Sequence, residues 1–293
     1  MYRFISFFIY KVIQRWRDHP KETQDKVFKR LVKNLSQTEF GRDHSITKKM
    51  TIKEFQERVP LFQYEDYEQK YIPLVQQGKK NILWPGRINY ICQSSGTTSG
   101  KKIIPNHFFA LYSNVKISLM MGFLFMREIK DYTLFKRKIF HLYGISKTQE
   151  INDITYGFVG HLSNSLVPEL IVKSKYPSSK DNAHDSWDEK VKWIAEDIIN
   201  HDIAVFSGTP PWMNSVLMSF NEKHQKPFSE YFPHLKLYVY GGCDFENYRR
   251  KFFELYGAEE SLYTLEVLPA SEGYIAFQDH WDHKSKNRKQ DML

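Results

Sequence analysis

The sequence contains little cysteine: only Cys92 and Cys243 occur among its 293 residues. Small secreted domains that are built on disulfides need several cysteine pairs, so this class of protein is excluded. The histidines at 280 and 283 have no further cysteine or histidine at metal-ligand spacing, so a zinc site is not expected. We predict a cytoplasmic protein in which both thiols act as small buried hydrophobic groups.

The sequence also lacks a long apolar run free of polar residues. Four polar or charged residues interrupt the longest candidate, residues 108–126: Ser113, Asn114, Lys116 and Ser118. A buried helix accounts for this stretch better than a membrane span. The aromatic segment 1–12 contains Arg3 and Lys11 and no small-residue cleavage site follows it, so neither a signal peptide nor stable membrane insertion is expected.

Positive charge is in modest excess, with 42 lysines and arginines against 34 acidic residues and a formal net charge of +8. Such an excess favours anionic ligands, including nucleotides, nucleic acids and lipid surfaces. The basic residues are scattered apart from a cluster at 284–289, and no aromatic-plus-basic RNA-binding module is present. Nucleic-acid binding and membrane-surface binding are therefore minor alternatives, whose mark would be strongly salt-dependent binding to DNA or anionic vesicles.

No internal repeat or Gly/Ser-rich linker divides the chain. Residues 24–35 carry apolar side chains at helical spacing, and from residue 88 short apolar runs alternate with helical patterns. Strands are expected at 88–92, 138–143, 203–206, 235–240 and 262–267. Helices are expected at 108–126 after a cap at Asn106, at 187–200, at 210–220 and at 248–255. We predict one α/β domain over residues 1–293, with mostly parallel sheets flanked by helices.

A loop rich in hydroxyl groups follows the first expected strand. It consists of Ser94, Ser95, Gly96, Thr97, Thr98, Ser99, Gly100, Lys101 and Lys102. Glycines let backbone N–H groups approach an anion, hydroxyls add donors, and lysines add positive charge. A P-loop is excluded, because the spacing from Gly96 to Gly100 is one residue short and Lys102 stands where Ser or Thr would hold magnesium. The alternative is a solvated surface turn.

Two further segments follow expected strands, namely Tyr240-Gly241-Gly242-Cys243 and Ala270-Ser271-Glu272-Gly273. Ligands of parallel α/β sheets bind beyond the carboxyl ends of the strands. The loops after Cys92, Tyr240 and Val267 are therefore expected to meet at one site. The plainer alternatives are a helix-entry turn for the glycine pair and an exposed turn for Glu272.

Taken together, these motifs resemble the acyl-acid amido synthetases, the auxin-responsive branch of the adenylate-forming enzymes. The resemblance extends over essentially the whole chain through Thr38-Glu39-Phe40-Gly41-Arg42-Asp43-His44, Val59-Pro60-Leu61, Tyr64-Glu65-Asp66-Tyr67, Leu83-Trp84-Pro85-Gly86, the Ser94–Lys102 loop and Gly208-Thr209-Pro210-Pro211-Trp212. It implies a large ATP-binding domain that activates a carboxylic acid as an acyl-adenylate. In the intact family an amine or amino acid then receives the acyl group.

The resemblance also implies roles for individual residues. Ser94 to Gly100 would hold the ATP phosphates, and Lys101 or Lys102 would screen their charge; which lysine does so stays open. Glu272 would hold Mg²⁺, since a hard cation between phosphates prefers oxygen ligands. The adenine-side positions would be Gly241, Gly242, Leu268, Ala270 and Ser271. By analogy alone, His161 and Trp212 would line an acyl pocket.

The sequence departs from the family pattern in three respects. The phosphate loop is one residue shorter before its lysine than in the amido synthetases, which leaves the choice between Lys101 and Lys102 open. Leu268 occupies a position where a tyrosine usually supports the adenine, so aromatic stacking would be lost. The chain ends at Leu293 without a Tyr-Arg-x-Gly-Asp-like segment. We therefore expect a C-terminally incomplete member whose C-terminal domain is absent or separately encoded. The alternative function is that of a non-catalytic remnant that binds a partner.

Overall fold

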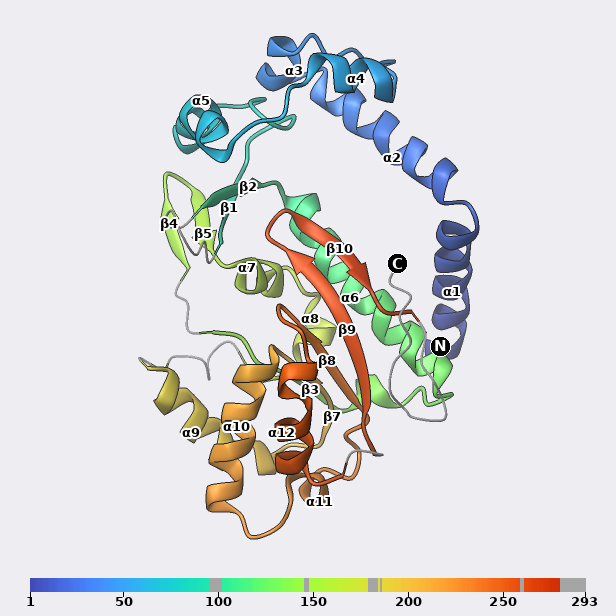
Figure 1. Cartoon of the computed structure of the whole chain (residues 1–293), viewed down its shortest axis with the longest axis vertical. Coiled ribbons are helices and arrows are strands. Elements are labelled where there is room, and N and C mark those ends of the chain that lie inside the picture. The colour runs from blue at the N-terminus through green and yellow to red at the C-terminus, as the bar shows by residue number, and fades with distance from the viewer. Residues whose placement is uncertain (95–101, 145–147, 179–183, 185, 259–260, 280–293) are drawn as a thin grey trace.

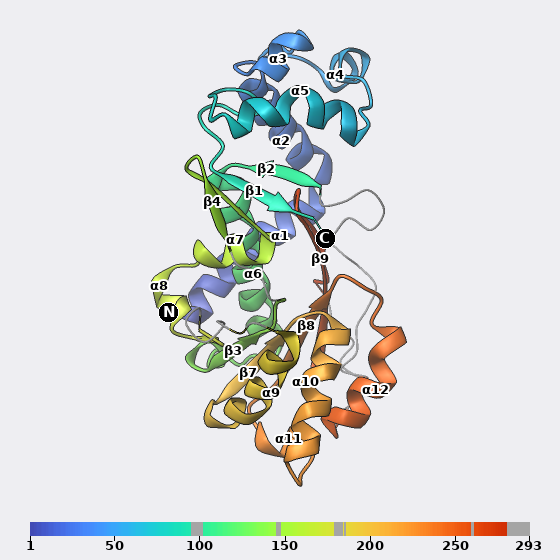
Figure 2. The same cartoon turned by 90° about the vertical axis from the view of Figure 1, so that its left-hand side faces the viewer.

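The computed structural model describes residues 1–94, 102–144, 148–178, 184, 186–258 and 261–279 (Figure 1). Helices form the N-terminal part: α1 (Tyr2–Asp18), α2 (Pro20–Leu35), α3 (Glu39–Asp43), α4 (Ile52–Arg58) and α5 (Tyr64–Gln76). Local signals begin several of them, because Pro20 occupies the first turn of α2 and Thr51 forms a capping box with Glu54 at α4. Helices α3 to α5 gather at one end of the molecule and α9 to α12 at the other (Figures 1 and 2).

A four-stranded sheet with the order β2-β1-β5-β4 follows the N-terminal helices. Its strands are β1 (Tyr90–Gln93), β2 (Ile103–Asn106), β4 (Gln149–Ile151) and β5 (Ile154–Gly157). Strands β1 and β5 are parallel, and the two outer strands pair antiparallel. Pro105 lies on the edge strand β2, where a residue without a backbone N–H is tolerated.

A larger sheet has the order β10-β9-β8-β7-β3-β6. Its strands are β3 (Lys138–His141), β6 (Lys175–Tyr176), β7 (Ile203–Ser207), β8 (Leu237–Gly241), β9 (Tyr263–Ala270) and β10 (Gly273–Phe277). All neighbouring pairs are parallel except β9 with β10, which form an antiparallel hairpin. The predicted α/β class with mostly parallel sheets is confirmed, although the sequence did not indicate that the strands divide between two sheets.

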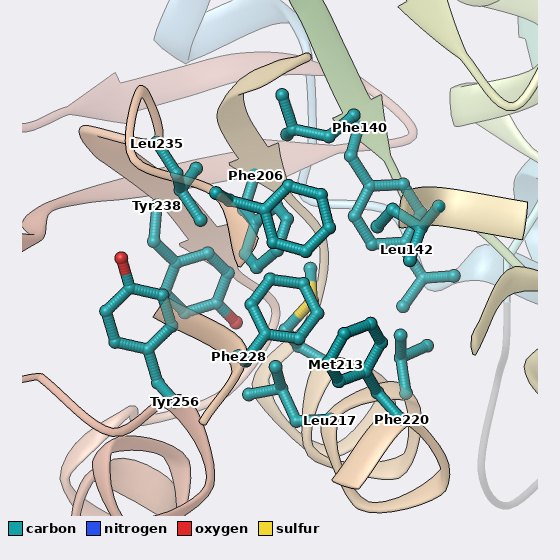
Figure 3. Close-up of a cluster of buried hydrophobic side chains, with 14 of the residues drawn as sticks. Phe140, Leu142, Phe206, Met213, Leu217, Phe220, Phe228, Leu235, Tyr238 and Tyr256 are labelled. Carbon is teal, nitrogen blue, oxygen red and sulfur yellow. The ribbon is translucent and has the colours of Figure 1, made fainter. Parts of the chain in front are cut away.

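Helices cover both faces of the large sheet. One face packs against α9 (Trp187–Asp197), α10 (Pro210–Lys223), α11 (Phe228–Tyr231) and α12 (Glu246–Tyr256) in a core rich in aromatic rings (Figure 3). The other face packs against α6 (Phe108–Glu128) and α1. The helices α7 (Val159–Ser165) and α8 (Glu169–Val172) and the 3₁₀ turns Leu134–Lys136 and Ile198–Asn200 complete the connections.

Two local predictions were wrong. Asn106 does not cap α6, because it is the last residue of β2; the cap is His107, whose Nδ1 accepts a hydrogen bond from the Phe109 N–H at 3.1 Å. The loop expected after Val267 is also absent, because β9 continues to Ala270 and places Leu268 within the strand. In both cases antiparallel pairing with a neighbouring strand extended the β structure, a tertiary effect that local sequence does not encode.

Helix α6 is long and apolar enough by length and composition to cross a membrane, with 39% of its most apolar stretch buried in the fold. It contacts α1, α7 and β10. Gly122 at its centre allows the Phe135 ring to approach, since a Cβ at that position would lie 2.4 Å from Phe135 Cζ. These contacts are those of a core helix, in agreement with the sequence prediction.

Candidate functional site

Strands β8 and β9 approach each other closely where β8 ends. Gly241 pairs with Val267, and a Cβ at position 241 would lie 2.4 Å from the Val267 carbonyl oxygen, so this approach requires glycine. Gly242 follows with φ of +85°, a backbone conformation that also favours glycine. Strand packing and the turn thus explain both glycines without reference to a ligand, and a contact with adenine stays a prediction.

The hydroxyl of Thr209 is buried beside this turn. Thr209 precedes α10, and its Oγ1 has no hydrogen-bond partner among the residues that the structure describes. A Cβ at Gly242 would lie 3.3 Å from the Thr209 Cγ2. Buried hydroxyl groups in proteins usually have a hydrogen-bond partner. A polar ligand bound next to the Gly242 backbone would supply the partner that the Thr209 hydroxyl lacks in the described part of the chain.

The base of the predicted phosphate loop is closed by one backbone hydrogen bond. The Ser94 N–H donates to the Lys102 carbonyl oxygen at 3.0 Å, which holds the two ends of the loop together. The Lys102 ammonium lies 5.0 Å above the ring of Tyr64, whose hydroxyl accepts a hydrogen bond from the Ile103 N–H. Lys102 therefore has a structural contact of its own. Residues 95–101, including Lys101, lie outside the described residues, as do 280–293.

The side-chain amide of Asn106, on the strand β2 that follows this loop, connects it to the predicted segment 270–273. The Asn106 Nδ2 donates to the Ser271 carbonyl oxygen at 3.0 Å and contacts the Cys92 Sγ at 3.2 Å. This contact brings the turn between β9 and β10, with Glu272 exposed on it, next to the end of β1. Burial, together with the negative charge of Glu272, raises the pKa of the Cys92 thiol to about 12. Cys92 is thus a buried thiol and not a nucleophile, whereas Cys243 is only partly buried.

The donor set is compatible with magnesium bound to a nucleotide. Mg²⁺ in such sites takes one or two carboxylates and completes its coordination with phosphate oxygens and water. Glu272 supplies one exposed carboxylate at the candidate site. No group of three or more His, Cys, Asp or Glu that would hold a metal by itself is present in the described part of the chain. A magnesium ion would therefore depend on the phosphates for most of its ligands.

A cavity of about 300 Å³ lies directly below these strand ends, between the large sheet and helices α6 and α7. Its floor consists of alternate residues of neighbouring strands, including Val205 on β7, Val239 on β8 and Val267 on β9. Side chains of α6, among them Val115 and Met121, cover it. Val239 and Val267 precede Gly241 and Ser271 closely in sequence, so the cavity adjoins the candidate nucleotide site.

A few polar side chains interrupt the apolar lining. On adjacent strands, His141 Nδ1 and Ser207 Oγ lie 3.1 Å apart. Burial, with the nearby positive charges as lesser causes, lowers the pKa of His141 to about 3, so its ring is neutral at physiological pH. On β6, the strand next to that of His141, Lys175 donates a hydrogen bond to the Asn164 Oδ1.

The sequence did not predict this cavity, and neither His161 nor Trp212, which the resemblance suggested for an acyl pocket, lines it. His161 does not line the cavity but packs its ring edge-on against Tyr143, with 4.5 Å between the centroids. Trp212 also lies outside it and contacts Trp187. His141 and Ser207 are polar residues that end apolar strands, and this pattern could have indicated the polar part of the cavity. Such residues are common at strand ends, so the pattern alone does not identify a cavity.

Comparisons with known proteins agree with this arrangement. Residues 9–181 match the family model described as "GH3 family N-terminal domain". A structure of the GH3.15 acyl acid amido synthetase in complex with 2,4-DB is similar with a TM-score of 0.66 at 14% identity, covering 88% of this chain and 54% of that one. A second GH3.15 structure gives 0.68 at 13% identity, with 92% and 57% covered.

The likeness also extends to 2-hydroxyisobutyryl-CoA ligase in complex with 2-HIB-AMP and CoA, with a TM-score of 0.54 at 12% identity, covering 92% of this chain and 54% of the ligase. At such low identity these likenesses concern the fold. The chain spans little more than half the length of each of these proteins, and no protein of curated function matches its sequence. Because the family model covers more than half of the chain, this protein belongs to the GH3 family.

Proposed function

We propose that this protein takes part in the ATP-dependent activation of a carboxylic acid as an acyl-adenylate. The observation that carries the proposal is the position of the apolar cavity, which adjoins the ends of β8 and β9. An acid whose apolar part fills the cavity would present its carboxylate at these strand ends, where the glycine turn and Glu272 lie. Apolar pockets with a few polar groups at one end are typical ligand sites.

The residues around the strand ends have roles that suit this chemistry. Ser94 to Gly100 would donate hydrogen bonds to phosphate oxygens, and Lys101 or Lys102 would offset their charge. Glu272 would hold Mg²⁺, which neutralises part of the phosphate charge when bound. Gly241, Gly242 and the free hydroxyl of Thr209 would contact the nucleoside.

The reaction needs positioning more than covalent help from the protein. A carboxylate oxygen would form a bond to the α-phosphorus while the bond to pyrophosphate breaks, and the oxygen atoms of the leaving group keep the released electron pair. No proton has to move, because carboxylic acids are ionised at neutral pH. Holding both reactants in one orientation supplies the larger part of the rate. Transfer of the acyl group to an amine or amino acid would follow as a second step.

The test is acid-dependent release of pyrophosphate from ATP and Mg²⁺, measured with a panel of carboxylic acids. We expect Glu272→Ala to lose at least about tenfold in rate, because it removes the proposed metal ligand. Glu222→Ala is the matched control, since Glu222 is an exposed glutamate on α10 outside the site. Equal rates for both variants, or release that does not depend on any acid, would contradict the proposal.

A further inference from the structure

The side of the cavity remote from β8 and β9 carries a lysine that the proposed reaction does not use. Lys175 lies on β6, the edge strand of the large sheet, where it pairs with Ile139 of β3. Both residues line the cavity. Lys175 donates a hydrogen bond to the Asn164 Oδ1 of α7, which lines the same side. The Lys175–Asn164 pair therefore forms a polar end of a mostly apolar cavity.

Lys175 has no negative partner in the described structure. None of the ion pairs there includes it, and neither Asp nor Glu lines the cavity among the described residues. Burial lowers the pKa of Lys175 to about 8, so the ammonium still carries its charge in most molecules at neutral pH. Lys175 is partly buried, and a charge that is partly removed from water without a counter-ion is unfavourable unless a ligand supplies one.

The surroundings of this end are positive as well. Lys190 on α9 is only 1% exposed, and its ammonium donates to the Tyr143 carbonyl oxygen at 2.7 Å. Its charge and that of Lys175 both act on His141, which stays neutral. Asn164 adds a further donor, because no hydrogen bond of its Nδ2 is found among the described residues. These groups together favour an anion with oxygen acceptors.

The strand order separates this end from the candidate nucleotide site. β6 lies three strands from β8 in the order β8-β7-β3-β6. With a spacing of about 4.8 Å between neighbouring strands, this corresponds to roughly 14 Å across the sheet. A ligand group bound at Lys175 is therefore distinct from the carboxylate that would react near Gly241, and apolar strand residues such as Val205 separate the two.

We propose that Lys175 and Asn164 bind a second carboxylate on the acid that occupies the cavity, so that the substrate is a dicarboxylic acid with an apolar spacer between its two acidic groups. The inference rests on the proposed function in taking the cavity as the acyl site. One carboxylate oxygen accepts from the Lys175 Nζ and the other from the Asn164 Nδ2, while the spacer contacts the valines of the sheet. The remote carboxylate is not changed in the reaction.

The experiment is calorimetric titration of the full chain, without nucleotide, using straight-chain α,ω-dicarboxylic acids and the monocarboxylic acids of equal length. A hydrogen bond to a charged group is worth about 1.5–3 kcal/mol, so we expect the best dicarboxylic acid to bind roughly 10- to 100-fold more tightly than its monocarboxylic partner. Lys175→Met should abolish this preference and leave monocarboxylate binding unchanged or stronger.

Two further variants keep the result interpretable. Lys192→Met changes an exposed lysine of α9 outside the cavity and should retain the full preference. Lys175→Gln removes the charge but keeps a polar side chain, so it replaces Lys175→Met if that variant does not fold. Because Lys175 has no counter-ion to leave behind, we expect both variants at this position to unfold at or above the wild-type temperature.

Three results would overturn the inference: equal affinities of the paired acids in the wild type, a preference that persists without the Lys175 charge, or no binding of either series. Failure of the proposed function is a separate outcome. A Lys175-dependent preference in a chain that releases no pyrophosphate would reject adenylation and retain the site. Acid-dependent pyrophosphate release without any preference would reject the site and retain adenylation.

Discussion

The two faces of the large sheet use the same strands in opposite ways. On one face the strand residues are large aromatics, Phe140, Phe206 and Tyr238, which pack against α10 and α12 (Figure 3). On the other face the neighbouring residues are smaller, such as Val205 and Val239, and they border the cavity below α6 and α7. Side chains alternate along a strand, so a single run of sequence builds both faces.

The two faces of the sheet therefore serve different purposes: the aromatic face stabilises the fold, and the cavity face leaves room for a ligand. The aromatic face consists of fully buried side chains, and close-packed protein interiors of this kind resist changes in volume. The cavity face gives up part of that packing and gains room for a ligand next to the strand ends. We expect substitutions on the aromatic face to act on the free energy of unfolding, and those on the cavity face to act mainly on binding.

The largest expected effect is the loss of an aromatic ring from the packed face. Phe206 is fully buried and lies edge-on to Phe140 at 5.3 Å and to Phe228 at 5.2 Å between centroids. Phe206→Ala should lower the free energy of unfolding by about 3–5 kcal/mol. Urea denaturation measures this change, and a loss near 1 kcal/mol would mean that the face tolerates a void and that the contrast does not hold.

The same enlargement of one valine on each side of the sheet should have different effects on the free energy of unfolding. Val216 lies on the helix that covers the aromatic face, and Val239 lies on the strand face that borders the cavity. Val216 on α10 is fully buried in the aromatic core, so Val216→Phe should cost about 1–3 kcal/mol through overpacking. Val239→Phe places the same extra volume in the cavity and should change the free energy of unfolding by less than about 1 kcal/mol. Equal costs for both variants in urea denaturation would show that the cavity face is as tightly packed as the other.

The partly buried charge of Lys175 should make stability depend on pH. Burial lowers its pKa in the folded chain to about 8, below the value of about 10.4 for an unfolded chain. Between these values the unfolded chain binds more protons, so the penalty is fully present below pH of about 8 and is lost as pH rises through about 10.4. Lys175→Met should therefore be more stable than wild type by about 1–2 kcal/mol near neutral pH, with no difference above about pH 11.

Urea denaturation of both proteins across this pH range tests the prediction. Lys190, whose pKa burial also lowers to about 8, titrates in both proteins and cancels in the comparison. His141 and His161 face the same region, and burial keeps their pKa values below the usual value. A stability difference that does not change with pH would assign the effect to packing and not to charge.

The smallest expected effect concerns the polar pair on the cavity face. Ser207→Ala removes the hydroxyl that lies 3.1 Å from the His141 Nδ1. Because a neutral hydrogen bond contributes modestly, we expect a loss of about 0.5–1.5 kcal/mol in the free energy of unfolding. A loss above about 3 kcal/mol would place Ser207 among the residues on which the fold depends, against the contrast drawn between the faces.

The sequence was informative wherever the cause of structure was local. The proline pair at 210 and 211 begins α10 as predicted, and apolar runs located β1, β3, β7, β8 and β9 but not the parallel strands β5 and β6. The capping prediction at Asn106 was wrong because the pairing of β2 with β1 is not encoded locally. Strand β6, with only Lys175 and Tyr176, was too short to produce any pattern.

For the candidate site too, the sequence predicted the parts that depend on local sequence and missed the part that depends on the order of the strands. The hydroxyl-rich loop and Glu272 follow strands directly and were identified from sequence, although their contacts with a nucleotide stay predictions. The cavity was not identified, because a buried parallel strand is apolar on both faces and its sequence does not show which residues border a void. His141 and Lys175 meet at the cavity only through the order of the strands.

The central claim is that the cavity presents an acid to the strand ends at which ATP would react. The most direct measurement compares acid-dependent pyrophosphate release by Val239→Phe with that by Ile275→Phe, which adds a similar volume at an exposed position of β10. We predict that filling the cavity lowers acid-dependent release by at least about tenfold, whereas the control retains it. Equal release by the two variants would show that the acid binds elsewhere and would contradict the account.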